Sequence, residues 1–130
     1  MNGTSVEAGR TDPRFIAEVV GPDGYITADR LVEQFRITKG ELALVAGLSR
    51  DAVSKLGRLK AGTTQSRLRD MVEIINRVRP WAGSTAQAFA WYRAQPLPSF
   101  GDQTAEALVK EGRAEAVKRY LDRMAVGGYA

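Results

Sequence analysis

Hydroxyl and basic side chains recur at close spacing near the middle of the chain. They comprise Ser49, Arg50, Ser54, Lys55, Arg58 and Lys60. On one helical segment, guanidinium, ammonium and hydroxyl groups are hydrogen-bond donors that suit DNA phosphates and the base edges of the major groove. The spacing therefore predicts a DNA-binding surface built from these six residues.

The charge of the chain is concentrated around the same residues. Residues 50–79 hold eight Lys and Arg against three acidic side chains, whereas the rest of the 130 residues hold eleven against twelve. The whole excess of positive charge therefore falls in one window of thirty residues. Such a window is typical of a nucleic-acid footprint, although an ordinary solvated helix face has a similar composition.

The chain lacks two residue types on which much enzyme chemistry depends. It has no cysteine and no histidine, which excludes disulfides, thiolate nucleophiles, imidazole bases and the usual zinc ligands. No phosphate-binding loop and no pair of carboxylates at a catalytic spacing is present. We therefore expect no catalytic residue, no bound metal and no cofactor, and a protein that is not an enzyme.

No apolar run approaches the roughly 18 residues of a membrane span, and the first twenty residues do not resemble a signal peptide. These features predict a cytoplasmic protein without a membrane partner.

Apolar residues recur at helical spacing, and no segment alternates as a half-buried strand would. We therefore expect an all-α helical bundle. Five hydroxyl residues stand where helices would begin, as N-caps, at Thr27, Thr38, Ser49, Ser84 and Thr104. The expected helices cover residues 13–20, 28–36, 39–47, 50–59, 66–81, 83–95, 104–112 and 113–127, with Pro80 ending the fifth.

The stretch KGELALVAGLSRDAVSKLGR has the pattern of a helix-turn-helix. Ala43 is the small residue expected where the two helices meet, and Gly47 suits a turn that needs a positive φ. Leu48 would fill the core beneath the turn. Val53 and Leu56, three residues apart, would hold the second helix against its neighbour.

The last third of the chain combines several weaker signals. They are Pro96, Leu97 and Gly101, a short helix with Thr104 and Leu108, then Gly112, Ala116, Val117, Leu121 and a terminal Gly127, Gly128 and Tyr129. This pattern resembles the C-terminal toxin-binding domain of Xre/MbcA/ParS-type antitoxins, and the middle is similar to their Xre-like helix-turn-helix. The family usually has proline where this chain has Ala105.

The resemblance implies three segments: an arm and short helix over residues 1–24, a helix-turn-helix region over 25–81 and a toxin-binding domain over 82–130. It also implies a RES-domain toxin that consumes NAD as partner, blocked by the antitoxin's last helix and tail in its active-site cleft. The residues expected to contact the toxin are Arg113, Arg119, Arg123, Gly127, Gly128, Tyr129 and Ala130.

Autorepression through operator DNA, and a homodimer within a hetero-oligomeric complex, are further expectations. One alternative is a stand-alone helix-turn-helix repressor whose last third only dimerises or senses a ligand. The tail separates the two hypotheses, because only an inhibitor should depend on the last few residues. Lys118 is expected with the arginines on the polar face of the last helix, and Phe89, Trp91 and Tyr92 in the core.

Overall fold

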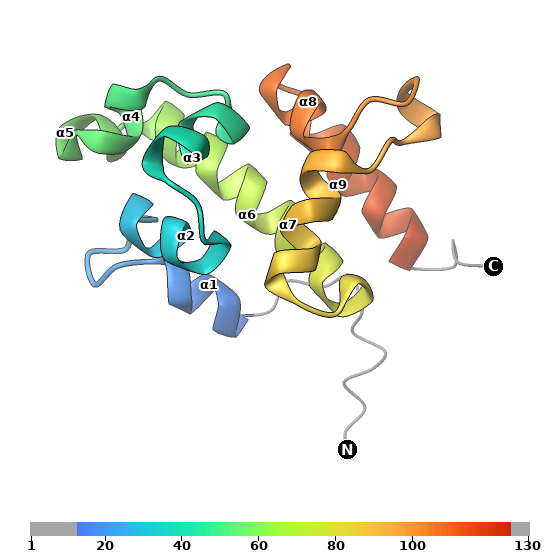
Figure 1. The fold of residues 1–130 in the computed structure, drawn as a ribbon, viewed down its shortest axis with the longest axis horizontal. Coiled ribbons are helices and arrows are strands. Elements are labelled where there is room, and N and C mark those ends of the chain that lie inside the picture. The colour runs from blue at the N-terminus through green and yellow to red at the C-terminus, as the bar shows by residue number, and fades with distance from the viewer. Residues whose placement is uncertain (1–12, 126–130) are drawn as a thin grey trace.

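The computed structural model describes residues 13–125, and within them the fold is an all-α bundle, as predicted (Figure 1). The α-helices are α1 Pro13–Val19, α2 Ala28–Phe35, α3 Lys39–Ala46, α4 Arg50–Ser54, α5 Leu56–Leu59, α6 Gly62–Ala82, α7 Thr85–Ala94, α8 Ala105–Lys110 and α9 Ala114–Arg123, with a 3₁₀ turn, η2, at Pro98–Phe100. Extended pairing among the described residues is confined to two isolated bridges, Val20 with Ile26 and Leu97 with Gln103. No helix in this range is long and apolar enough to cross a membrane.

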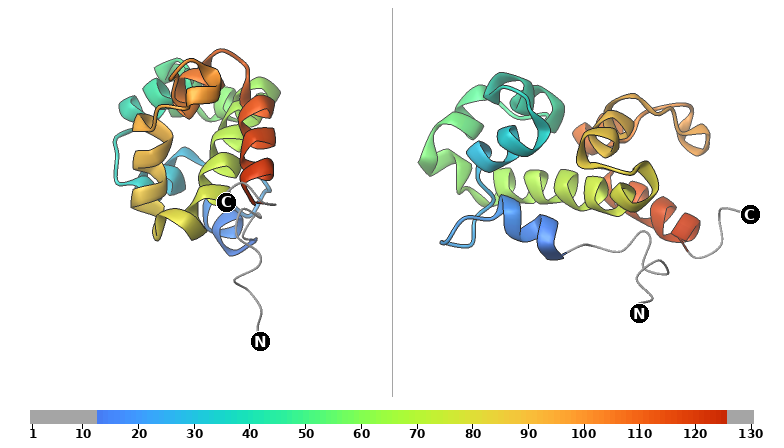
Figure 2. Two further views of the ribbon diagram at one scale, coloured as in Figure 1. Left: turned by 90° about the vertical axis from the view of Figure 1, so that its right-hand side faces the viewer. Right: turned by 60° about the horizontal axis from the view of Figure 1, so that its bottom comes forward.

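The helix α6 is the axis of the molecule, with α1–α5 towards one of its ends and α7–α9 towards the other (Figure 2). It packs against α1, α3 and α5 as well as α7, α8 and α9. Its buried face includes Leu68, Met71 and Val72, which lie at helical spacing. One hydrophobic cluster therefore runs through both the second and the third segment expected from the sequence.

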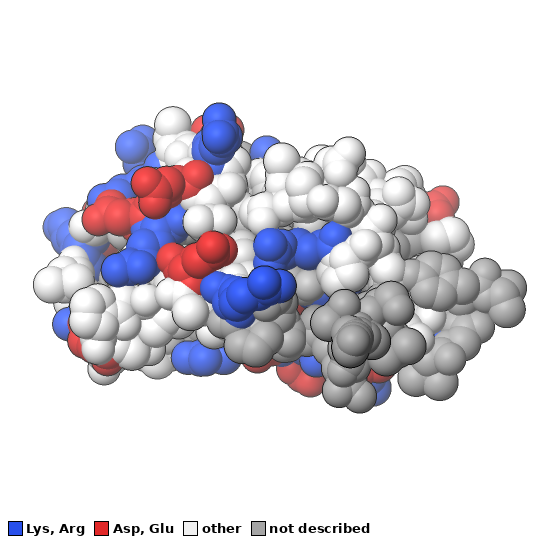
Figure 3. All heavy atoms as spheres, turned by 90° about the horizontal axis from the view of Figure 1, so that it is seen from below, with Lys and Arg blue, Asp and Glu red and all other residues white. Residues whose placement is uncertain are grey.

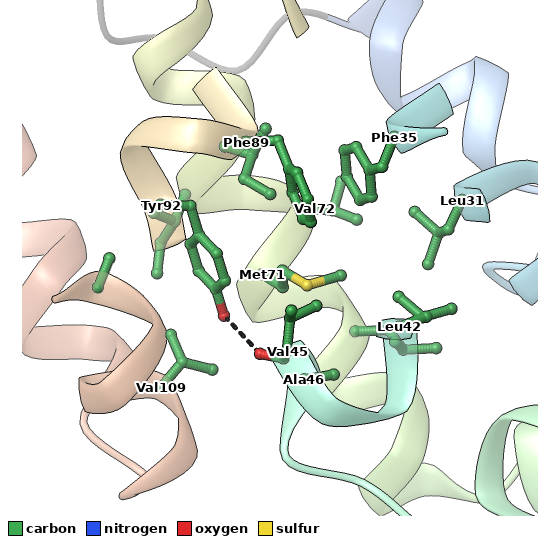
Figure 4. Packing of buried hydrophobic residues seen from close by; sticks show 14 of the residues in the cluster. Leu31, Phe35, Leu42, Val45, Ala46, Met71, Val72, Phe89, Tyr92 and Val109 are labelled. Carbon is green, nitrogen blue, oxygen red and sulfur yellow. Dashed lines mark hydrogen bonds between the residues drawn. The ribbon is translucent and has the colours of Figure 1, made fainter. Parts of the chain in front are cut away.

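Aromatic side chains join the two ends of this cluster. The rings of Phe35 from α2 and Phe89 from α7 stack with centroids 4.6 Å apart (Figure 4). Tyr92, also on α7, is fully buried, and Trp91 is half-buried against the core. Phe89 and Tyr92 thus occupy the core positions predicted for them.

The predicted N-caps are confirmed. The side-chain oxygen of each capping residue accepts a hydrogen bond from the backbone N–H three residues later, at Thr27, Thr38, Ser49, Ser84 and Thr104. At Thr38 the bond is reciprocal, because Glu41 accepts from the Thr38 backbone N–H in a capping box. Five helix starts are therefore encoded locally.

The prediction for Pro80 was wrong. The helix α6 begins at Gly62, continues through Pro80 and ends at Ala82. Pro80 is exposed and lies in the last turn, where a proline removes a single intrahelical hydrogen bond. The helix ends instead at Gly83, whose φ is 100° and whose N–H donates to the carbonyl of Arg79.

Candidate functional sites

The turn between α3 and α4 depends on one glycine. Gly47 has a φ of 69°, and the next N–H, of Leu48, donates to the carbonyl of Ala43 across 2.9 Å. A Cβ at position 47 would stand 2.8 Å from a nitrogen of Arg67 and 2.9 Å from a side-chain carbon of Lys110. Both the backbone conformation and the lack of space therefore require glycine here.

The carbonyl groups at the end of α3 bond to residues far along the chain. The guanidinium of Arg67 on α6 donates to the carbonyl of Ala46 across 2.9 Å. The hydroxyl of Tyr92 on α7 donates to the carbonyl of Val45, drawn as a dashed line in Figure 4. Burial raises the pKa of Tyr92 far above its usual range, so its hydroxyl remains a neutral donor. These bonds fix the turn that precedes α4.

The second helix of this pair differs from the prediction. The expected single helix over residues 50–59 is interrupted at Lys55, whose backbone is extended with φ −99° and ψ 123°. Helix α5 follows as a separate turn that contains Gly57, a weak helix former.

The predicted packing role of Leu56 was wrong, because its side chain is 66% exposed. Val53 is buried as expected, and Leu59 fills the inward position of α5. Leu56 instead borders a pocket of about 300 Å³ between α2 and α4–α5.

Most of the predicted DNA-binding residues lie exposed along α4 and α5. Arg50, Ser54, Lys55 and Arg58 are all exposed, and Arg50 and Arg58 form no ion pair with another described residue. Lys55 lies 3.8 Å from Asp51, a loose pair in which both side chains are exposed. The Ser49 hydroxyl accepts from the N–H of Ala52, so its oxygen is engaged as a helix cap.

Lys60 lies apart from this group. Its ammonium is 3.0 Å from a carboxylate oxygen of Asp23 and 5.2 Å from the ring centre of Tyr25. The hydrogen bond from Lys60 lowers the pKa of Asp23. The surface is also not uniformly basic: on the face in Figure 3, blue and red side chains alternate, mainly towards the end that carries α1–α5.

Two ion-pair groups fix α9 to α6. The ammonium of Lys118 lies 2.8 Å from Asp70, 2.6 Å from Glu73 and 3.1 Å from Glu115. One turn further along, Arg77 pairs with Asp122 at 2.9 Å. Lys118 is thus buried in an ionic cluster, which corrects its expected place on the solvated polar face.

Although burial acts in the opposite direction, the carboxylates around Lys118 raise its pKa above the ordinary 10.5. The position could have been recognised from spacing. Ala114, Val117, Lys118 and Leu121 stand at i, i+3, i+4 and i+7, which places Lys118 within the buried stripe of α9.

The remaining basic residues of α9 face away from α6. Arg113, Arg119 and Arg123 are exposed, as expected for residues that contact a partner. The other predicted contact residues, Gly127, Gly128, Tyr129 and Ala130, lie outside the described range.

The comparison with known families identifies this part of the molecule. Residues 77–127 match the family model of the antitoxin Xre/MbcA/ParS C-terminal toxin-binding domain. The chain carries this antitoxin domain. The predicted resemblance is thereby confirmed for residues 77–127, and a toxin-binding domain indicates a protein toxin as the partner. No curated protein and no solved structure matches the chain.

The toxin-binding domain contains an aromatic cluster that the sequence pattern did not predict. The ring of Phe100, in the connector between α7 and α8, meets the ring of Tyr120 edge-on with centroids 5.8 Å apart. The guanidinium of Arg113 lies 5.5 Å from the centre of the Phe100 ring. Phe100 and Tyr120 are both half-buried. Only the sequence-distant pairing of residues 100 and 120 reveals this cluster.

Candidate metal ligands do not gather in the part of the chain that the structure describes. No group of three or more acidic residues there could hold a metal ion. The carboxylates of Asp70, Glu73 and Glu115 converge on the ammonium of Lys118 instead.

Proposed function

We propose that this protein inhibits a RES-domain, NAD-consuming toxin by placing the end of α9 and the residues after it in the toxin's active-site cleft. The observation that carries the proposal is the toxin-binding domain at residues 77–127, which ends directly before Gly128, Tyr129 and Ala130. The identity of the toxin and its NAD chemistry come from the family resemblance.

The fixed position of α9 supports this mechanism. Because Lys118 and Asp122 bind α9 to α6, the helix presents its last turn in one orientation. A rigid presenting element lowers the conformational entropy lost on binding. In the proposed complex Gly128 avoids steric conflict in a narrow cleft, the ring of Tyr129 fills an apolar pocket, and the carboxylate of Ala130 occupies the place of an NAD phosphate.

We further propose that the exposed side of α4 and α5 binds operator DNA and that the protein represses its own promoter. The local excess of positive charge supports this, as do the exposed donors Arg50, Lys55 and Arg58. The fixed α3–α4 turn would hold α4 as a helix that enters the major groove must be held. A homodimer would then match a two-fold symmetric operator.

The inhibitory role is tested by co-expression with the product of the neighbouring reading frame. Growth and cellular NAD are measured for the full chain and for a chain that ends at Val126. We expect the full chain to restore both, and the shortened chain to restore neither. If the shortened chain protects equally well, or if the neighbouring product is not toxic, the stand-alone repressor becomes the better hypothesis.

A further inference from the structure

The outward face of α9 has a composition that its own fold does not explain. Ala116, Arg119, Tyr120 and Arg123 stand at i, i+3, i+4 and i+7, so they share one side of the helix. The buried stripe of Ala114, Val117, Lys118 and Leu121 lies on the other side. The outward face therefore combines an aromatic ring with two exposed arginines.

Charge on this face is entirely positive. The acidic residues Glu115 and Asp122 of α9 bind Lys118 and Arg77, respectively. Arg119 and Arg123, by contrast, form no ion pair with another residue in the described range. The intramolecular pairs thus neutralise the acids of the helix and leave its outward arginines for another molecule.

The connector between α7 and α8 (orange in Figure 1) extends the face with a second aromatic ring. It is closed at its base, where the N–H groups of Leu97 and Gln103 donate to the carbonyls of Gln103 and Phe100. Gly101 and Asp102 both have a positive φ, at 64° and 67°. A non-glycine residue in this conformation is uncommon and is typical of a loop held in one shape.

Held in this way, Phe100 lies against Tyr120 and under the guanidinium of Arg113. Aromatic residues and arginine are the types most enriched among the residues that contribute most to protein–protein binding. An edge-to-face pair that is half-buried before binding loses little side-chain entropy when a partner covers it.

We infer that Phe100 and Tyr120 form the principal affinity anchor for the toxin, and that Arg113, Arg119 and Arg123 around them bind carboxylates on an acidic toxin surface. This inference rests on the proposed function. The other exposed faces of the domain offer less. On α8, Glu106 already binds Arg93 and Lys110, and α7 exposes chiefly alanines.

The inference separates two tasks within one domain. The aromatic anchor determines how tightly the toxin is held, whereas the residues after Val126 determine whether its cleft is blocked. A chain that ends at Val126 should therefore still bind the toxin. A chain with an altered anchor should bind more weakly, yet still inhibit fully at saturating concentration.

The test measures the affinity of full-length variants for the purified product of the neighbouring reading frame. We expect Phe100→Ala to weaken binding about 30-fold or more, and Arg113→Ala about 3-fold to 10-fold. Phe100→Leu keeps apolar volume in the core and removes the ring, so it separates loss of the anchor from loss of folding. Tyr25→Ala, which removes an exposed ring outside the domain, is the matched control.

Three results would overturn the inference. One is binding within twofold of the parent for both Phe100 variants while the Val126 chain fails to inhibit, which leaves the proposed function intact. A second is weaker DNA binding by the Arg119→Ala and Arg123→Ala variants with unchanged toxin affinity. The third is a full chain that does not bind the product at all, which removes the proposed function as well.

Discussion

The hydroxyl of Tyr92 lies 3.5 Å from the carbonyl oxygen of Val45, so a residue of the toxin-binding domain bonds directly to the helix that precedes the α3–α4 turn. Both residues are fully buried. Because neither group can exchange this bond for water, the contact couples the stability of the turn to the packing of α7.

Replacing Tyr92 with phenylalanine tests this contact. The ring still fills the core, but the carbonyl of Val45 loses its side-chain donor. We expect Tyr92→Phe to lower the free energy of unfolding by about 0.5–1 kcal/mol, since the bond is long. Urea denaturation measures the change. Tyr25→Phe, at a partly exposed residue, should leave the midpoint unaltered.

Lys118→Met should destabilise the protein by about 2–3 kcal/mol. The substitution keeps an apolar stem but leaves Asp70 and Glu73 close together without their shared cation, and both carboxylates retain some contact with water. Chemical denaturation at neutral pH measures the loss. The matched variant Arg119→Met removes an exposed cation from the same helix and should cost less than about 0.5 kcal/mol.

The pH dependence of stability should also change in Lys118→Met. In the folded state the pKa of Lys118 is raised, so its contribution is fully present below 10.5 and is lost as pH rises towards the folded value. Above pH 10.5 the parent should therefore lose stability more steeply than the variant. Parallel pH profiles for the two proteins would contradict this account.

Two glycines should respond to alanine in opposite directions. Gly47→Ala places a Cβ at a positive φ and against Arg67 and Lys110, and we expect it to cost about 1–2 kcal/mol or more. Gly57 lies in α5, and a Cβ added there would meet no other atom within 4 Å. Gly57→Ala should therefore stabilise the protein by up to about 1 kcal/mol. Thermal melts of the two variants side by side test both signs.

Val53 and Leu56 should differ despite their similar chemistry. Val53→Ala removes two buried methyl groups and should cost about 2 kcal/mol. Leu56→Ser alters a largely exposed side chain and should change stability by less than about 0.5 kcal/mol. A large loss in Leu56→Ser would mean that residues 50–59 form the continuous helix expected from the sequence.

Salt titration tests the proposed DNA contact. A symmetric dimer that makes about six to ten phosphate contacts should lose roughly a thousandfold or more in affinity between about 50 and 200 mM salt. Arg58→Ala should weaken binding and reduce the salt slope, while toxin inhibition stays unchanged. Affinity that does not vary with salt would show that the α3–α4 unit is a scaffold without DNA contacts.

Local signals in the sequence predicted most helix starts and the α3–α4 turn. Thr38 and Ser49 cap helices through bonds to residues three positions away, and Gly47 is required by the backbone itself. These interactions depend on near neighbours, so the sequence contains all the information needed to predict them.

The errors arose where tertiary contacts outweigh local preference. Leu56 has the spacing of a core residue, but the break at Lys55 turns it outward and Leu59 takes the inward position. Lys118 is buried because carboxylates from α6, more than forty residues earlier in the chain, surround its ammonium. The pairing of Phe100 with Tyr120 likewise depends on how the connector folds back onto α9.

The continuous helix α6 also has a consequence for geometry. At 1.5 Å per residue its 21 residues span about 30 Å, close to one turn of the DNA double helix. Helices α4 and α5 lie at one end of the molecule's long axis, and the last described turn of α9 lies towards the other (Figure 1). In the proposed complex, α6 acts as a ruler that carries the toxin at a constant offset from the operator. The bulk of the toxin would then set how closely a second copy can sit on the same DNA.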